Sequence, residues 1–172
     1  MSTWTGADAV VHALGLNGVD TIFGIPGFQT YELFDSFARR EPPFSLFTTR
    51  HEQAAGYMAF GYARATGNLG VFTVVPGPGV LNAASAICTA QSTATPLLCI
   101  VGQIPSFSIG KGWGMLHELP DQLATLKTIS KHAVRIDNIA DTLPIMQEAI
   151  RIATSGVPGV VVVEMAMDKM AE

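Results

Sequence analysis

Residues 49–67 read TRHEQAAGYMAFGYARATG, and the rest of the chain is organised around this stretch. It follows a short apolar run, residues 44–47, which is typical of a buried strand. Its composition predicts a helix of unusually small residues that ends at Gly67. One carboxylate, Glu52, falls in the first turn of this helix, and the function of the protein depends on what that carboxylate does.

Glu52 has a structural interpretation that requires no chemistry. Thr49 and Glu52 have the S/T-x-x-E spacing of a capping box, in which hydroxyl and carboxylate each satisfy a backbone N–H at the helix start. An acidic residue in the first turn also suits the positive end of the helix dipole. A functional role for Glu52 therefore needs support from other segments of the chain.

Length and composition indicate one globular domain that binds no nucleic acid and spans no membrane. Of its 172 residues, 48% are hydrophobic and 14% are charged, so the chain can bury a core and is not disordered. Its net charge is −4 and it has no basic cluster, which argues against nucleic acid. No apolar run is long enough to cross a bilayer, and no basic-then-apolar leader begins the sequence. The low charge suggests that a partner covers part of the surface.

The cysteines and histidines predict neither a disulfide nor a metal site. Cys88 and Cys99 both fall in apolar segments, which is typical of small buried residues in a reducing compartment. The four histidines are scattered and have no metal-ligand spacing. We therefore expect a cytoplasmic protein and no metal site in this chain.

Apolar strands alternate with helices along the sequence. We expect strands at residues 21–25, 44–47, 70–75, 96–101, 131–136 and 160–164. We expect helices from Thr5 to near Gly18 and at residues 31–40, 52–67, 80–94 and 139–154. This alternation predicts an α/β fold with a parallel sheet covered on both faces. Residues 105–120 are glycine-rich and weakly periodic, and we predict no helix or strand there.

Four candidate site segments each follow an expected strand. They are Pro26-Gly27, Glu52, Pro76 to Gly79, and Gln103. The carboxyl ends of parallel strands share one edge of the sheet, and ligands bind beyond that edge. Four segments meeting there are more than a capping role for Glu52 requires.

Two glycine-rich segments leave alternatives open. Gly77-Pro78-Gly79 before a helix is similar to a phosphate-binding turn, but Asn82 occupies the sixth position of G-x-G-x-x-G and Pro78 has no N–H. A tight turn between a strand and a helix is the simpler interpretation. Gly110 to Gly114 suits either a mobile lid over a site or a flexible surface loop. His117, which follows it, is typical of a solvated loop residue.

A set of short motifs, in order, resembles the N-terminal pyrimidine-binding domain of thiamine diphosphate enzymes. The similarity is closest to the acetolactate synthase group, with benzoylformate decarboxylase and related 2-keto acid decarboxylases nearby, and it covers almost the whole chain. The motifs are Ile25-Pro26-Gly27, Arg50-His51-Glu52-Gln53-Ala54-Ala55, Gly61-Tyr62-Ala63-Arg64-Ala65-Thr66-Gly67, Gly77-Pro78-Gly79-x-x-Asn82, Pro96-Leu97-Leu98-x-x-x-Gly102-Gln103, Lys131-His132 and Gly156-x-Pro158-Gly159-x-Val161.

The resemblance implies a fold and a role for each candidate residue. The fold is a three-layer α/β sandwich with a six-stranded parallel, flavodoxin-like sheet, in which residues 1–172 form one domain. Glu52 is implied to bind N1′ of the cofactor's aminopyrimidine and, with a proton affinity raised by desolvation, to activate the cofactor for attack on a 2-keto acid. The residues implied to line the pyrimidine pocket are Pro26, Gly27, Pro78 and Asn82. Gln103 is implied to face the substrate.

The resemblance also implies partners. The family holds the diphosphate through Mg²⁺ with a Gly-Asp-Gly motif on a separate domain, and this sequence contains no Gly-Asp-Gly. The chain is therefore expected to be the N-terminal part of a longer enzyme, or a subunit whose partner carries that domain, and to be inactive alone. A homodimer or tetramer is implied, with the helices after Glu52 and Gly79 packed against a second copy. Val75-Pro76 replaces the Thr-Ser usual in synthases, so decarboxylase and carboligase both stay open.

Two alternatives compete with this function. One is a non-catalytic nucleotide-binding or regulatory module with the same sheet. The other is a structural homologue in which Glu52 only caps its helix.

Overall fold

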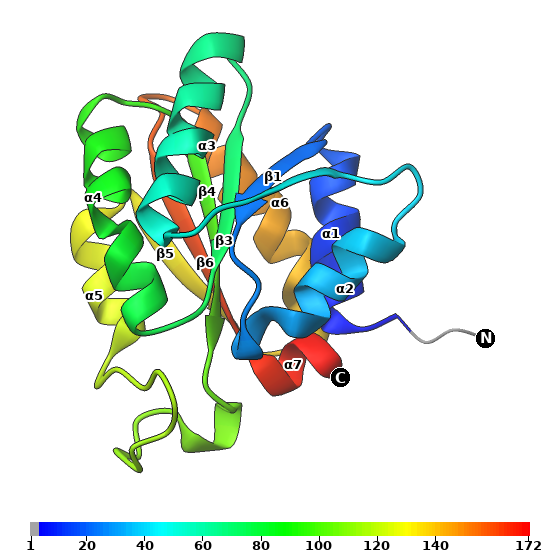
Figure 1. Ribbon diagram of the computed structural model, residues 1–172, viewed down its shortest axis with the longest axis vertical. Coiled ribbons are helices and arrows are strands. Elements are labelled where there is room, and N and C mark those ends of the chain that lie inside the picture. The colour runs from blue at the N-terminus through cyan, green and yellow to red at the C-terminus, as the bar shows by residue number, and fades with distance from the viewer. Residues whose placement is uncertain (1–3) are drawn as a thin grey trace.

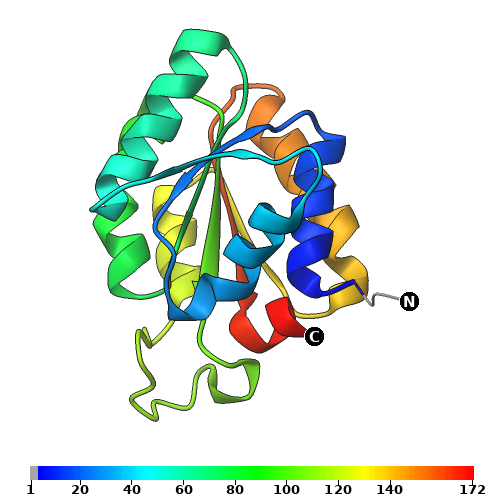
Figure 2. The ribbon, with the colours of Figure 1, turned by 45° about the vertical axis from the view of Figure 1, so that its right-hand side comes forward.

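A six-stranded parallel sheet lies between two layers of helices in the computed structural model, which describes residues 4–172 (Figures 1 and 2). The strand order is β2-β1-β3-β4-β6-β5, and every pairing is parallel. The strands are β1 (Thr21–Gly24), β2 (Ser45–Thr48), β3 (Gly70–Val74), β4 (Leu97–Gln103), β5 (His132–Ile136) and β6 (Val160–Ala166). The predicted α/β class and the six-stranded parallel sheet are confirmed.

Helices on the two faces of the sheet come from different parts of the chain (Figure 1). Four helices cover one face: α1 (Gly6–Leu16), α2 (Tyr31–Arg39), α6 (Thr142–Thr154) and α7 (Met167–Ala171). The other face carries α3 (Glu52–Thr66), α4 (Pro78–Ser92) and α5 (Gln122–Ile129). Three short 3₁₀ turns occur among residues 4–172: η1 (Phe28–Thr30), η2 (Ser106–Ser108) and η3 (Ile139–Asp141).

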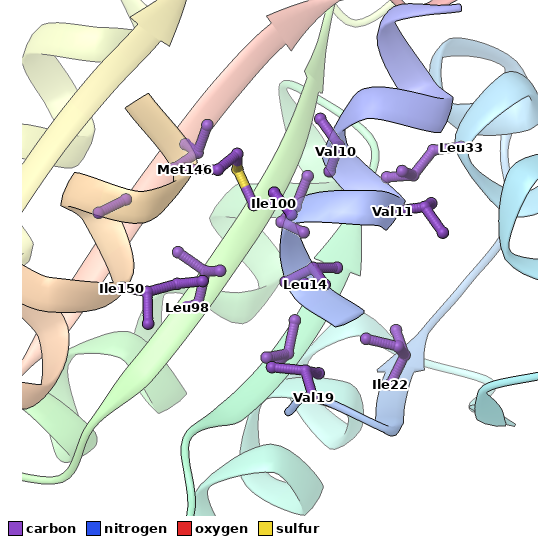
Figure 3. Close-up of a cluster of buried hydrophobic side chains, with 14 of the residues drawn as sticks. Val10, Val11, Leu14, Val19, Ile22, Leu33, Leu98, Ile100, Met146 and Ile150 are labelled. Carbon is purple, nitrogen blue, oxygen red and sulfur yellow. The ribbon is translucent and has the colours of Figure 1, made fainter. Parts of the chain in front are cut away.

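Alternate residues of the central strands supply the two cores. Leu98 and Ile100 of β4 pack with Leu14 and other residues of α1 and α6 (Figure 3), whereas Leu97 and Cys99 pack under α3 and α4. This alternation follows from the two-residue period of a strand, and it makes a strand covered on both faces continuously apolar. Burial also raises the pKa of the Cys99 thiol, as expected for an apolar environment.

The second strand is the main difference from the expected sheet. The sequence predicted a buried strand at residues 44–47, but β2 is an edge strand that pairs only with β1. The Phe47 side chain is 48% exposed, although it stacks on Phe23 at 5.5 Å between ring centroids. An apolar run alone does not distinguish a central strand from an edge strand, because strand order depends on contacts distant in sequence.

The sequence analysis missed two short helices and was wrong about the burial of Cys88. Two short helices, α5 and α7, were not predicted; α5 begins after Asp121, whose carboxylate accepts a hydrogen bond from the Ala124 N–H at 2.9 Å. Cys88 is exposed, because it lies on the face of α4 that points away from the sheet, although its neighbour Ile87 is buried. Over residues 4–172, none of the helices has the length and apolar character needed to cross a bilayer.

Candidate functional site

The candidate site lies at the carboxyl edge of the sheet, where Gly27 and Gly79 both pack against Val75. An ideal Cβ on Gly27 would lie 2.4 Å from a Val75 methyl group, and one on Gly79 would lie 2.5 Å from the other. Both positions therefore require glycine. Of the four segments expected to converge, these contacts bring together Pro26-Gly27 and the Pro76 to Gly79 turn.

Glu52 and Asn82 form the polar centre of this site. Glu52 is the first residue of α3 and is partly buried, and Asn82 lies one turn into α4. The Asn82 Nδ2 donates a hydrogen bond to Glu52 Oε2 at 2.9 Å. A Cβ on Gly79 would lie 3.7 Å from Glu52 Oε1, so the other carboxylate oxygen faces the first turn of α4. The carboxylate thus lies between two helix N-termini, which favour negative charge.

The predicted capping box of Thr49 and Glu52 is wrong. The helix begins two residues later than that motif requires, because its N-cap is His51 and not Thr49. His51 Nδ1 accepts a hydrogen bond from the Gln53 N–H at 3.2 Å, and Thr49 Oγ1 donates to the His51 carbonyl at 2.9 Å. His51 therefore has a structural role at the start of α3. The Glu52 carboxylate therefore bonds the Asn82 side chain and does not cap its own helix.

Replacing His51 with alanine is expected to lower the free energy of unfolding by about 1 kcal/mol, because the Gln53 N–H loses its capping acceptor. Replacing Glu52 with glutamine should change it by less than about 0.5 kcal/mol, since that carboxylate makes no cap. Urea unfolding of both variants measures the difference. Equal losses in the two variants would restore the capping interpretation of Glu52.

The Gly77-Pro78 turn is closed by protein groups on both sides. Gly77 has φ 59°, and its N–H donates to the buried Gln122 Oε1 at 2.8 Å. A Cβ on Gly77 would lie 2.4 Å from the His117 carbonyl oxygen. Two positions of this turn therefore offer no N–H to a phosphate, because the Gly77 N–H is already bonded and Pro78 has none.

Residues 105–120 form a loop that extends beyond the carboxyl edge (Figure 1) and is tied to the domain at both ends. Near its start, the Ser106 hydroxyl and N–H donate to Asp168 at 2.5 and 2.8 Å. Burial alone raises the pKa of Asp168, but these hydrogen bonds outweigh it and the pKa lies below its usual value. Near its end, Gln29 Nε2 donates to the Leu116 carbonyl at 2.9 Å.

His117 is fixed in place rather than solvated, contrary to expectation. The amide nitrogen of Gln29, Nε2, donates to the Leu116 carbonyl, so the Gln29 oxygen, Oε1, points to His117. Gln29 Oε1 lies 2.9 Å from His117 Nδ1. His117 also has φ 67°, an unusual backbone conformation for a residue other than glycine. Gln29 is 88 residues away in the sequence, so no local pattern identified this pair.

The remaining predicted residues differ in exposure. Pro26, Pro78 and Asn82 are exposed at the edge. Gln103 is only 3% exposed, and its Oε1 accepts a hydrogen bond from the Ile104 N–H at 2.8 Å. Three large apolar side chains lie exposed on α3 and α4 beside the site: Tyr57, Met58 and Leu81.

The residues present suit the pyrimidine end of thiamine diphosphate. A partly buried carboxylate with a free oxygen can bond a ring nitrogen, while Asn82 holds the other oxygen. The diphosphate end has no comparable ligands: over residues 4–172, no group of three or more His, Cys, Asp or Glu side chains is placed to hold a metal ion.

Comparison with known proteins relates the chain to one family. A family model described as thiamine pyrophosphate enzyme, N-terminal TPP binding domain, matches residues 4–125. The chain is 48% identical over 128 residues to the probable 2-ketoarginine decarboxylase of Pseudomonas aeruginosa, covering 74% of this chain and 22% of that protein. It is 35% identical over 168 residues to the acetolactate synthase large subunit of Buchnera aphidicola, covering 98% and 29%. Identity to the same subunit of Parasynechococcus marenigrum is 38% over 168 residues, covering 96% and 27%. The chain thus spans 22 to 29% of the length of these relatives.

Proposed function

This chain belongs to the family of thiamine pyrophosphate enzymes, as their N-terminal TPP-binding domain, and from that premise we propose that Glu52 activates the cofactor through N1′ of its aminopyrimidine. In the complete protein this domain would serve an enzyme that decarboxylates a 2-keto acid or joins it to a second carbonyl compound. Bound thiamine diphosphate supplies the carbon nucleophile and the electron sink for such chemistry.

The observation that carries the proposal is the hydrogen bonding of the Glu52 carboxylate. This carboxylate does not cap its own helix, and one of its two oxygens accepts a hydrogen bond from Asn82. The other oxygen keeps lone pairs that can share a proton with N1′. Asn82 fixes the orientation of the carboxylate, and Pro26, Gly27 and Pro78 would form walls around the ring.

A partner is proposed to complete the site. Glu52 is only partly buried here, and water at the carboxylate would weaken the proton sharing that activation needs. The exposed Tyr57, Met58 and Leu81 beside it suit a covering surface. We propose a second copy of the chain in a homodimer or tetramer, together with a diphosphate-binding domain that holds Mg²⁺.

Substrate and location are also proposals. The relatives are described as a 2-ketoarginine decarboxylase and acetolactate synthases, so 2-keto acids are the substrate class that they support. Gln103 on the substrate side stays a prediction, since its side chain here bonds its own backbone neighbour. The free Cys88 and Cys99 support a reducing, cytoplasmic location.

The 172-residue chain alone is expected to show no turnover of 2-keto acids with thiamine diphosphate and Mg²⁺, because its described residues, 4–172, include no group of side chains placed to hold the metal ion. It should also show no saturable binding of AMP, since the Gly77 N–H is already bonded to Gln122. Steady-state assays and titration calorimetry test both points. Turnover by the chain would refute the need for a second domain, and saturable AMP binding would favour a nucleotide-binding module.

A further inference from the structure

A buried glutamine, Gln122, joins three strand ends beneath the candidate site. It is the first residue of α5 and is 1% exposed. Its Oε1 accepts from the Gly77 N–H at 2.8 Å, and its Nε2 donates to the Gly102 carbonyl at 3.1 Å and to Glu164 Oε2 at 2.7 Å. Both N–H groups of the amide are therefore used, and the side chain has one possible orientation.

The partner of Gln122 is a fully buried carboxylate. Glu164 lies on β6 with no exposed surface, and its other oxygen accepts from Arg135 Nε on β5, whose side chain is 19% exposed. The network therefore extends across the ends of β3, β4, β6 and β5. Fully satisfied buried networks of this kind hold their members rigidly, because any displacement leaves a buried polar group without a partner.

Helix α4 connects this network to Glu52. Gly77 directly precedes this helix, and Asn82, which bonds Glu52, is its fifth residue. The His117 carbonyl also packs closely against Gly77, since a Cβ there would lie 2.4 Å from it. The position of Gly77 thus sets where α4 begins and where Asn82 meets the carboxylate.

We propose that Gln122 is a positioning residue of this site: by holding the Gly77 N–H it fixes the start of α4 and thereby the Asn82–Glu52 hydrogen bond. The inference rests on the proposed function of Glu52. It gives Gln122 a role distinct from stability alone, although it touches neither Glu52 nor the space beside it.

Gln91, which lies near the end of α4, provides a control glutamine. Its Oε1 accepts from the Val160 N–H at 3.0 Å, at the amino end of β6 and so at the opposite edge of the sheet. Gln122→Met and Gln91→Met each remove the acceptor of one backbone N–H and keep a side chain of similar length. Gln122→Met also removes the donors to the Gly102 carbonyl and to Glu164. A purely structural role predicts similar behaviour of the two variants at the site.

The test uses the complete enzyme and two measurements. Deuterium uptake by the peptide covering residues 76–83 is followed without cofactor by mass spectrometry, and exchange of the cofactor's C2 proton is followed in the loaded enzyme by quenched NMR. In Gln122→Met we expect peptide uptake about tenfold faster and C2 exchange about tenfold slower, with both unchanged in Gln91→Met. Equal values for the two variants at either measurement would overturn the proposal.

A double variant covers the case in which Gln122→Met does not fold. Gln122→Glu combined with Glu164→Gln keeps an acceptor for the Gly77 N–H and a donor between the two side chains, and of the three Gln122 bonds it gives up the one to the Gly102 carbonyl. It should keep wild-type peptide uptake and C2 exchange, and loss of either would contradict the proposal. If wild-type and Glu52→Gln enzymes exchange C2 equally, the proposed function fails, while peptide uptake still tests the role of Gln122 at the turn.

Discussion

Glu52→Gln in the complete enzyme is expected to lower turnover by about two to four orders of magnitude, because an amide cannot share a proton with N1′ as a carboxylate does. The amide oxygen can still accept from Asn82 Nδ2, so the local structure should persist. Steady-state kinetics with 2-keto acid substrates, together with the C2 exchange rate of bound cofactor, measure the effect.

Glu32→Gln is the matched control for this prediction. Glu32 is an exposed acidic residue in the first turn of α2, so the same substitution removes the same charge at an equivalent helix position. Turnover of Glu32→Gln should equal that of the wild type. Near-normal rates in Glu52→Gln would reject the activating role, whatever its effect on stability.

Arg135→Met is expected to lower the free energy of unfolding by about 3–5 kcal/mol, because it leaves the buried Glu164 carboxylate without its counter-charge. Gln122 still donates to that carboxylate, but one neutral hydrogen bond does not replace an ion pair in a buried environment. Urea unfolding at neutral pH gives the value, either with the chain alone or with the complete enzyme.

Two further variants make the result specific to the buried charge. Adding Glu164→Gln to Arg135→Met should recover part of the lost stability, because the uncompensated charge is removed. Arg151→Met removes an exposed pair with Glu148, whose side chains are 63% and 52% exposed, and should cause no measurable change. A loss in Arg151→Met as large as that in Arg135→Met would show that burial is not the cause.

Much of the fold followed from local patterns. The strands of the sheet and the helices that start at Gly6, Tyr31 and Glu52 lie within a few residues of the predicted positions. These elements could be predicted because the spacing of apolar residues and the helix-capping residues depend only on neighbours in the sequence. The predicted start after Thr5 is confirmed by a capping box in which Thr5 and Asp8 bond each other's backbone N–H. The same spacing at Thr49 and Glu52 was misleading, because His51 took the N-cap position instead.

The sequence by itself determined the α/β class, the parallel sheet, the edge at which the candidate residues gather, and the family resemblance that selects Glu52. These depend on residue type, period and order along the chain, which are local properties. Only the tertiary structure decided that β2 is an edge strand, that Asn82 holds Glu52, and that Gln29 and Gln122 fix His117 and Gly77. These contacts join residues 30 to 88 positions apart, and a hydrogen-bond partner at such separation is set by how the elements pack.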